Sequence, residues 1–348
     1  MTSPVPGPTP SPHHGSTGAA SGQSYPAPSM PPVAYGPPSM APTQPAQPAQ
    51  PAPASFAAPT GEGWSGRSLT TSEKSTQEAL LALKSEIGKA VVGQDAAVTG
   101  LIVSLVAGGH TLLEGVPGVA KTLLVRTLAQ ALDVEMARIQ FTPDLMPADI
   151  TGSMIWDAGR SEFVFREGPV FTNLLLADEI NRTPPKTQSA LLESMEEHTV
   201  SIDGATRTLP DPFMVIATQN PVEQAGTYPL PEAQVDRFML KVRLDYPSKE
   251  EEQQIVRQNI VGEFPKANAV VKPEDIERAR SVVRDVYLDE KIAHYIVDIV
   301  FATRRPGDYG MAQYKPLIGF GGSPRASIGL ALASKAYAFI KRRGYVVP

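Results

Sequence analysis

The sequence predicts an α/β protein in which a parallel sheet is covered by helices on both faces and is followed by a small all-helical domain. Two observations favour this fold class. Short apolar runs, such as 174–177 and 213–218, alternate with helical stretches between residues 110 and 244. Strands without polar alternation are typical of parallel sheets, which are buried on both faces. After Tyr246-Pro247 only helical patterns continue.

The elements are placed by their periodicity and by their end signals. Thr70-Thr71-Ser72-Glu73 offers a capping box for the first helix. The expected helices span 75–89, 95–106, 121–132, 185–197, 249–260, 274–286, 289–303 and 324–343. The expected strands span 110–113, 135–140, 174–177, 213–218 and 238–244. Strands that alternate with helices in this way indicate a parallel sheet with crossover helices.

The 348 residues divide into three expected parts: a tail over 1–69, a core over 70–247 and a helical lid over 248–348. Residues 1–61 contain no Asp, Glu, Lys or Arg and many of the 35 prolines, so this segment cannot bury enough apolar surface to fold. We expect a disordered tail with polyproline II character, which is either a plain linker or a PxxP ligand. Residues 345–348 resemble a turn into one more helix, so we expect a truncated carboxyl end.

A glycine-rich loop after the strand 110–113 is the first candidate site. It reads Gly115-Val116-Pro117-Gly118-Val119-Ala120-Lys121-Thr122 and matches the phosphate-binding pattern G-x-x-x-x-G-K-[ST] except at Ala120. We expect Ala120 to begin the next helix, where alanine is tolerated. Lys121 is predicted to reach the β- and γ-phosphates of ATP, and Thr122 to ligate Mg²⁺. A strand-to-helix turn without a ligand is the alternative.

Two further strands deliver polar residues to the same edge of the sheet. The run 174–177 leads into Asp178, predicted to hold Mg²⁺, and Glu179, predicted to polarise the attacking water. Helix N-caps are the structural alternative for these carboxylates. The run 213–218 leads to Asn220, whose side-chain amide is predicted to lie beside the γ-phosphate. The alternative is that Asn220 only starts a turn before Pro221.

These motifs resemble the MoxR family of AAA+ ATPases over about residues 72–348. The resemblance also rests on Asp-Glu-Ile-Asn-Arg (178–182), Leu-Pro-Glu-Ala-Gln-Val-Asp-Arg-Phe (230–238) and Gly-Ser-Pro-Arg-Ala-Ser (322–327). It implies that Asn220 is sensor 1 and that Val92 and Gly93 lie beside the adenine.

The resemblance also implies three functional arginines. Arg237 matches the arginine finger that reaches a neighbouring subunit's γ-phosphate, and Arg325 matches sensor 2 on the helical lid. Arg182 is a further candidate for a charge that acts on a neighbour. The alternatives are an ion pair of Arg237 with Asp236 or Glu232, and an Arg325 that merely starts a helix.

The resemblance implies a homo-oligomeric ring, typically a hexamer, that hydrolyses ATP and remodels partner proteins in a chaperone-like manner. The partners would carry von Willebrand factor A domains and be assisted in maturation or metal insertion. Residues 141–171 resemble a β-hairpin inserted into a helix, and residues 199–210 resemble a second hairpin. Such hairpins would face the pore or top of the ring, or else simply close a sheet edge.

Composition bears on the competing functions. A net charge of −5 weighs against the runner-up, a nucleic-acid motor. A non-hydrolysing nucleotide switch that scaffolds partners is the third interpretation. The chain has no cysteine, and its five histidines lack metal-ligand spacing. The apolar run 96–113 is interrupted by polar residues and glycines, and the amino terminus lacks a secretory signal, so we expect a cytoplasmic protein without membrane insertion.

Overall fold

A five-stranded parallel sheet lies at the centre of the computed structural model, which describes residues 70–221, 226–262 and 265–348. Its strand order is β2-β5-β8-β1-β9, and every neighbouring pair is parallel. The strands are β1 (Thr111–Gly115), β2 (Met136–Gln140), β5 (Leu174–Asp178), β8 (Met214–Gln219) and β9 (Leu240–Leu244). The predicted fold class is therefore confirmed. The tail expected over 1–69 lies outside the described residues.

Both faces of the sheet are covered, which explains why the central strand β5 is apolar up to its last residue, Asp178. Every residue of β5 is buried. Leu174 and Leu176 join a core cluster with helices α1 (Thr71–Ala90), α2 (Asp95–Ala107) and α3 (Lys121–Leu132). Leu175 and Ala177 join a second cluster with α5 (Pro185–Glu197). A strand that alternates between two apolar layers has no position for a polar side chain until it ends.

The first helix has the predicted capping box, although it begins at Thr71, four residues before the expected start at residue 75. The Thr70 hydroxyl accepts a hydrogen bond from the Glu73 N–H at 3.2 Å, and the Glu73 carboxylate accepts one from the Thr70 N–H at 2.7 Å. This reciprocal capping box satisfies two of the donors that a helix start leaves unpaired.

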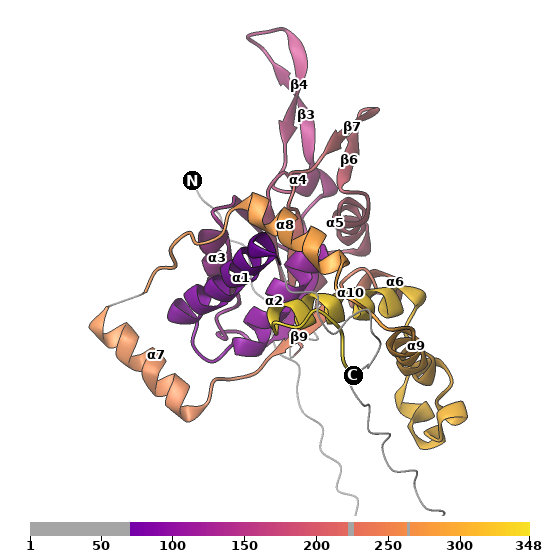
Figure 1. Ribbon diagram of the computed structural model, residues 1–348. Helices are drawn as coiled ribbons and strands as arrows, with labels where there is room; N and C mark the ends of the chain where they lie inside the picture. Colours follow the sequence, from indigo (N-terminus) through magenta and orange to yellow (C-terminus); the bar gives the residue numbers. More distant parts are fainter. Residues whose placement is uncertain (1–69, 222–225, 263–264) are drawn as a thin grey trace, which may run out of the picture. The chain divides into compact units, whose positions relative to one another are not determined.

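Two β-hairpins project from the core (Figure 1). The first pairs β3 (Gly152–Asp157) with β4 (Glu162–Glu167), and the second pairs β6 (Thr199–Ile202) with β7 (Ala205–Thr208). The short helix α4 (Pro147–Thr151) precedes the first hairpin, but residues 168–173 after it are not helical. The expected insertion into a helix is therefore correct on one side only. After the hairpin, Gly168 lies against the backbone of Ile150 and Gly152, where a Cβ would collide with the Ile150 carbonyl oxygen.

The two hairpins also touch each other. The guanidinium carbon of Arg207 on β7 lies 4.0 Å from the centroid of the Phe165 ring on β4. Near the end of the first hairpin, Trp156 and Phe163 are opposite each other across the strands, with ring centroids 5.2 Å apart in an edge-to-face arrangement. Both rings are more than half exposed.

The carboxyl-terminal part of the chain is helical, as predicted. It contains α7 (Lys249–Val261), α8 (Pro273–Arg284), α9 (Glu290–Arg304) and α10 (Pro324–Ile340), with the 3₁₀ turns η2 (Pro306–Tyr309) and η3 (Ala312–Leu317). Apolar residues of α8 and α10 join the same core cluster as those of α1 and α2. The division between a core ending at 247 and a lid starting at 248 stays a prediction.

The last described residues differ from the expected turn into a helix. Tyr345 forms a parallel bridge with Tyr287, and the Val346 N–H donates to the Tyr287 carbonyl at 3.0 Å. Burial of the Val346 side chain favours this extended pairing. Among the described residues, no helix is both long enough and apolar enough to span a bilayer.

Candidate functional site

The candidate residues follow three neighbouring strands of the sheet. β1 runs into the glycine-rich loop, β5 ends at Asp178, and Asn220 follows β8. Because the strands are parallel and β8 lies between β1 and β5, their carboxyl ends meet at one edge. The strand order therefore brings together the three motifs that the sequence separates by about a hundred residues.

The loop backbone is shaped by its glycines. Gly115 lies so close to β9 that a Cβ on it would be 3.0 Å from the Leu244 carbonyl oxygen. Gly118 has a φ of 88°, in the left-handed region that favours glycine. The Val119 side chain between them and the helix is buried in the core and anchors the loop, while Val116 is partly buried and Pro117 is exposed.

The expectation that Ala120 is tolerated because it begins the next helix was wrong. Ala120 does not begin α3 in a helical conformation but has φ 61° and ψ 25°, which is left-handed. An alanine in this region costs about 1–2 kcal/mol more than a right-handed one because its Cβ crowds the next carbonyl. The conformation matches the glycine of the general pattern, so the loop holds its shape with a strained alanine.

The Lys121 ammonium lies inside the loop. Its Nζ donates to the Gly115 carbonyl at 2.5 Å and lies 3.4 Å from the Val116 carbonyl. Burial lowers the pKa of Lys121, and the nearby carboxylates of Asp178 and Glu179 oppose that shift. Thr122 follows as the second residue of α3. The loop and this helix start therefore place the Lys121 ammonium near the two carboxylates, with the Thr122 hydroxyl on the next residue of the chain.

Asp178 is buried and has partners on both oxygens. Oδ1 accepts a hydrogen bond from the Thr218 hydroxyl at 2.6 Å. Oδ2 accepts from Nη2 of Arg138 at 2.6 Å and from its Nε at 3.1 Å. A buried carboxylate is costly unless it is paired, so in this structure Arg138 supplies the compensating positive charge.

Glu179 directly follows the strand with a φ of 58°. Its N–H donates to the Thr218 hydroxyl at 2.8 Å, and its Oε2 accepts from Nε2 of Gln140 at 2.8 Å. Nε of Arg182 lies 3.0 Å from the same oxygen. Arg182 therefore pairs within its own chain here, and its action on a neighbour stays a prediction. Asn220 is buried at the end of β8, as expected for a residue delivered by an apolar strand.

The two remaining arginines form a second group. Nε of Arg237 lies 3.1 Å from Oε2 of Glu196 on α5, and Nη2 of Arg325 donates to Oε1 of the same carboxylate. Arg237 thus pairs with neither Asp236 nor Glu232, the alternatives that the sequence offered. Arg325 does lie in the first turn of α10, so it both starts a helix and joins this cluster.

The remaining predicted residues lie beside α7. Gly93 has a φ of 77°, and a Cβ on it would be 2.7 Å from a carboxylate oxygen of Glu251. Val92 is half-buried next to it. No partner that marks an adenine site is seen at this turn in the described part of the chain, so the roles of Val92 and Gly93 stay predictions.

Sequence reasoning missed Arg138, Gln140 and Glu196. Arg138 and Gln140 alternate on β2 and so lie on one face, which was a usable signal once the sheet order placed β2 next to β5. Glu196 gave no signal of its own, because Arg325 is 129 residues away in the sequence.

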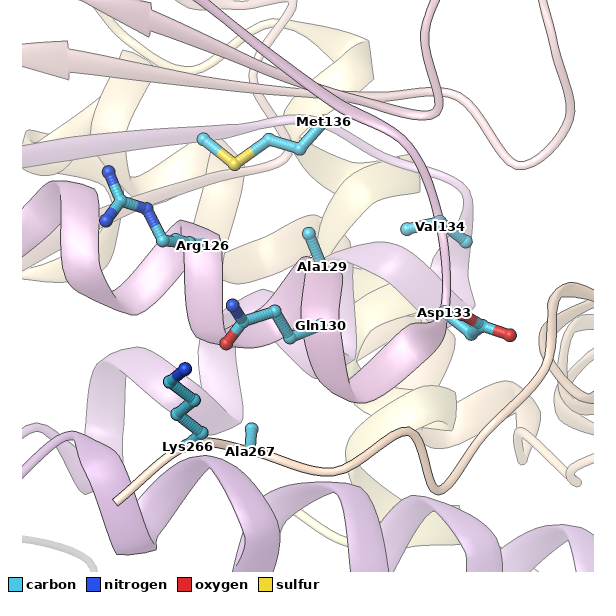
Figure 2. A pocket seen from close by; sticks show the side chains of 8 residues that line it. All are labelled: Arg126, Ala129, Gln130, Asp133, Val134, Met136, Lys266 and Ala267. Atoms are coloured by element: carbon cyan, nitrogen blue, oxygen red, sulfur yellow. The ribbon is translucent and has the colours of Figure 1, made fainter. Parts of the chain in front are cut away.

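A pocket of about 580 Å³ lies elsewhere, beside the carboxyl-terminal half of α3. Figure 2 shows its lining side chains, which come from α3, the start of β2 and residues 266–267. It contains none of the predicted site residues.

Comparison with known proteins decides the family. Residues 110–240 match the model of the ATPase family associated with various cellular activities. The chain is 49% identical over 263 residues to the chaperone MoxR1 of Mycobacterium tuberculosis, covering 76% of this chain and 70% of that protein. The chain belongs to the MoxR family of AAA+ ATPases.

Other members of the MoxR family agree. The protein MoxR of Methylorubrum extorquens is 30% identical over 293 residues, covering 78% of this chain and 83% of that one. A crystal structure of a proposed ATPase from Cytophaga hutchinsonii superposes with a TM-score of 0.74 at 46% identity, covering 80% of this chain and 84% of that one. This MoxR-family chain is accordingly a nucleotide-binding AAA+ ATPase with a general chaperone role.

Proposed function

We propose that the chain hydrolyses ATP with Mg²⁺ and uses the energy to remodel partner proteins. The observation that carries this proposal is the convergence of Lys121, Asp178, Glu179 and Asn220 at one edge of the parallel sheet. A non-hydrolysing switch would not need a second carboxylate beside the first. Glu179 is held by Gln140 and by the Thr218 hydroxyl, which orients it without burying it completely.

The residues present fit a nucleotide with its metal ion. The left-handed Gly118 and Ala120 turn the loop backbone into a concave path ahead of a helix N-terminus, which is suited to phosphates. Thr122 and Asp178 would hold Mg²⁺, which prefers one or two protein oxygen ligands together with phosphates. When bound, the ion neutralises part of the phosphate charge.

Each residue then has a distinct role. Lys121 binds the β- and γ-phosphates and would exchange its two loop carbonyls for them. Glu179 accepts a hydrogen bond from the attacking water and orients it, and Asn220 positions that water or the γ-phosphate. Val92 and Gly93 contact the adenine.

We further propose that hydrolysis is completed between the subunits of a ring, with six as the expected number. The charge that develops on the γ-phosphate exceeds what one lysine and one metal ion neutralise. Arg237 would supply the missing charge to a neighbour, and Arg325 would assist it. Within one chain both arginines pair with Glu196, and among the described residues neither pairs with Asp178 or Glu179, which supports a role outside their own subunit.

The partners that we propose are proteins with von Willebrand factor A domains. The resemblance to the family and the chaperone name of a relative support this class. The Glu179→Gln variant loaded with ATP is the appropriate bait for a purified domain of this type. Retention that requires ATP would support the proposal, and equal retention with ADP would contradict it.

Steady-state ATP hydrolysis measured across protein concentration tests the enzymatic proposal. We expect turnover per subunit to rise with concentration, because assembly supplies Arg237. Glu179→Gln should lower kcat by about 10²-fold or more, and Arg237→Ala by about 10³-fold, while both variants still bind ATP. Turnover that is independent of concentration would contradict the ring, and turnover that survives Glu179→Gln would contradict the assignment of the base.

A further inference from the structure

The Glu196 carboxylate connects two arginines from distant parts of the fold. Its Oε2 pairs with Arg237, which follows α6 (Glu232–Val235), and its Oε1 accepts from Arg325 on α10. The two guanidinium groups therefore meet at one anion. Two like charges would repel each other at this range, so their convergence depends on the carboxylate between them.

A second contact holds the backbones that carry these arginines. The Ser323 hydroxyl donates to Oδ2 of Asp236 at 2.6 Å, and it accepts from the Arg325 N–H at 3.0 Å. Asp236 directly precedes Arg237, and Ser323 is the N-cap of α10. The start of α10 is thus tied to the residue before Arg237, and the arrangement does not rest on one surface ion pair alone.

Glu196 itself is on a well-anchored turn. The preceding Met195 is buried, and its carbonyl accepts a hydrogen bond from Nε2 of the buried His110 at 3.0 Å. The Glu196 side chain, in contrast, is 37% exposed. It is therefore a fixed carboxylate at the surface, where exposed ion pairs contribute about 0–1 kcal/mol each. A phosphate group carries more charge, so it can replace the Glu196 carboxylate as the partner of the two arginines at little cost in free energy.

We propose that Glu196 is a positioning residue, which holds Arg237 and Arg325 together so that they meet the same phosphate of a neighbouring subunit's nucleotide. In this role Glu196 acts through the two arginines and not directly on the nucleotide or on the attacking water. It fixes the spacing of the two guanidinium groups before assembly, which lowers the ordering cost at the moment of reaction. This inference rests on the proposed function, because it assigns a role within hydrolysis completed between subunits.

Glu196→Gln removes the charge and keeps the shape, and Glu197→Gln is the matched control on the next residue of the same helix. We expect Glu196→Gln to lower kcat by about 5–10-fold with KM for ATP changed less than twofold, because the nucleotide's own pocket is untouched. Glu197→Gln should retain the wild-type kcat. Glu196→Asp, which keeps the charge, should retain more turnover than Glu196→Gln.

The role is separated from general destabilisation by a double variant and by thermal unfolding. In an Arg325→Ala background, Glu196→Gln should cost less than twofold, because the pair that it positions is already lost. The Tm of the single variant Glu196→Gln should stay within about 2 °C of the Tm of Glu197→Gln. A Glu196→Gln enzyme with the kcat of Glu197→Gln would overturn the inference while Arg237→Ala still supports the ring. Absence of turnover in the wild type would overturn the proposed function and this inference with it.

Discussion

At the scale of single residues, Ala120 shows how the loop tolerates a departure from its usual pattern. Its left-handed conformation is imposed from outside, by the buried Val119 on one side and by the start of α3 on the other. Alanine at this position holds the same backbone path that glycine would hold, at the cost of local strain. The loop geometry is therefore fixed by packing and not by the identity of this residue.

This strain predicts that Ala120→Gly stabilises the fold. Relief of the Cβ crowding outweighs the added freedom of the unfolded chain, so we expect the free energy of unfolding to rise by about 0.5–1 kcal/mol. Ala293→Gly, within the right-handed α9, should instead lower it by about 1 kcal/mol. Chemical denaturation compares the two. If both variants were destabilised alike, the left-handed conformation of Ala120 would be wrong.

At the scale of secondary-structure elements, His110 connects β1, β8 and α5. It directly precedes β1, its Nδ1 accepts from the Val215 N–H of β8 at 3.0 Å, and its Nε2–H donates to Met195 of α5. Burial lowers the pKa of His110 to about 4, His198 and Arg280 act in the same direction, and the Met195 carbonyl opposes them. The ring is therefore neutral in the folded protein at neutral pH.

The depressed pKa predicts that stability falls in mild acid. Between pH 6.5 and about 4 the unfolded chain binds a proton on His110 that the folded chain excludes. As the pH falls through this window, the free energy of unfolding should decrease by up to about 3 kcal/mol from this residue. In His110→Gln this part of the slope should disappear, although the variant is less stable at pH 7.

The control is His294→Gln, which changes an exposed histidine on α9. Urea denaturation at pH 7 and pH 5 should show the wild-type pH dependence in this control. An unchanged slope in His110→Gln would contradict the assignment of the depressed pKa to His110.

At the scale of the whole molecule, the sequence was most informative where local pattern and tertiary environment agree. The short unbroken apolar run that became β5 favoured a strand buried on both faces over a helix, and the run that became β8 followed the same logic. Once strands and helices alternate, the parallel sheet and the meeting of its carboxyl ends follow. The grouping of Asp178 and Glu179 with Lys121 was therefore predictable.

The remaining features depend on contacts that no local pattern encodes. The left-handed Ala120 depends on the burial of Val119 and on where α3 starts, and the glycine at 115 is needed because β9 pairs directly beside it. The pairing of Asp178 with Arg138 requires that β2 be the neighbour of β5. The resemblance pointed to Arg237 and Arg325, but their common carboxylate emerges only after α5 and α10 are packed.

The contact between Arg207 and Phe165 has a mechanical consequence. It ties the first hairpin, with its exposed Trp156 and Phe163 rings, to the second hairpin, so a load applied to one is shared by the other. The second hairpin begins at Thr199, shortly after the helical turn that carries Glu196. If the proposed ring forms, we expect a displacement of Glu196 at the subunit boundary to move the second hairpin and, through Arg207, the exposed aromatic rings of the first.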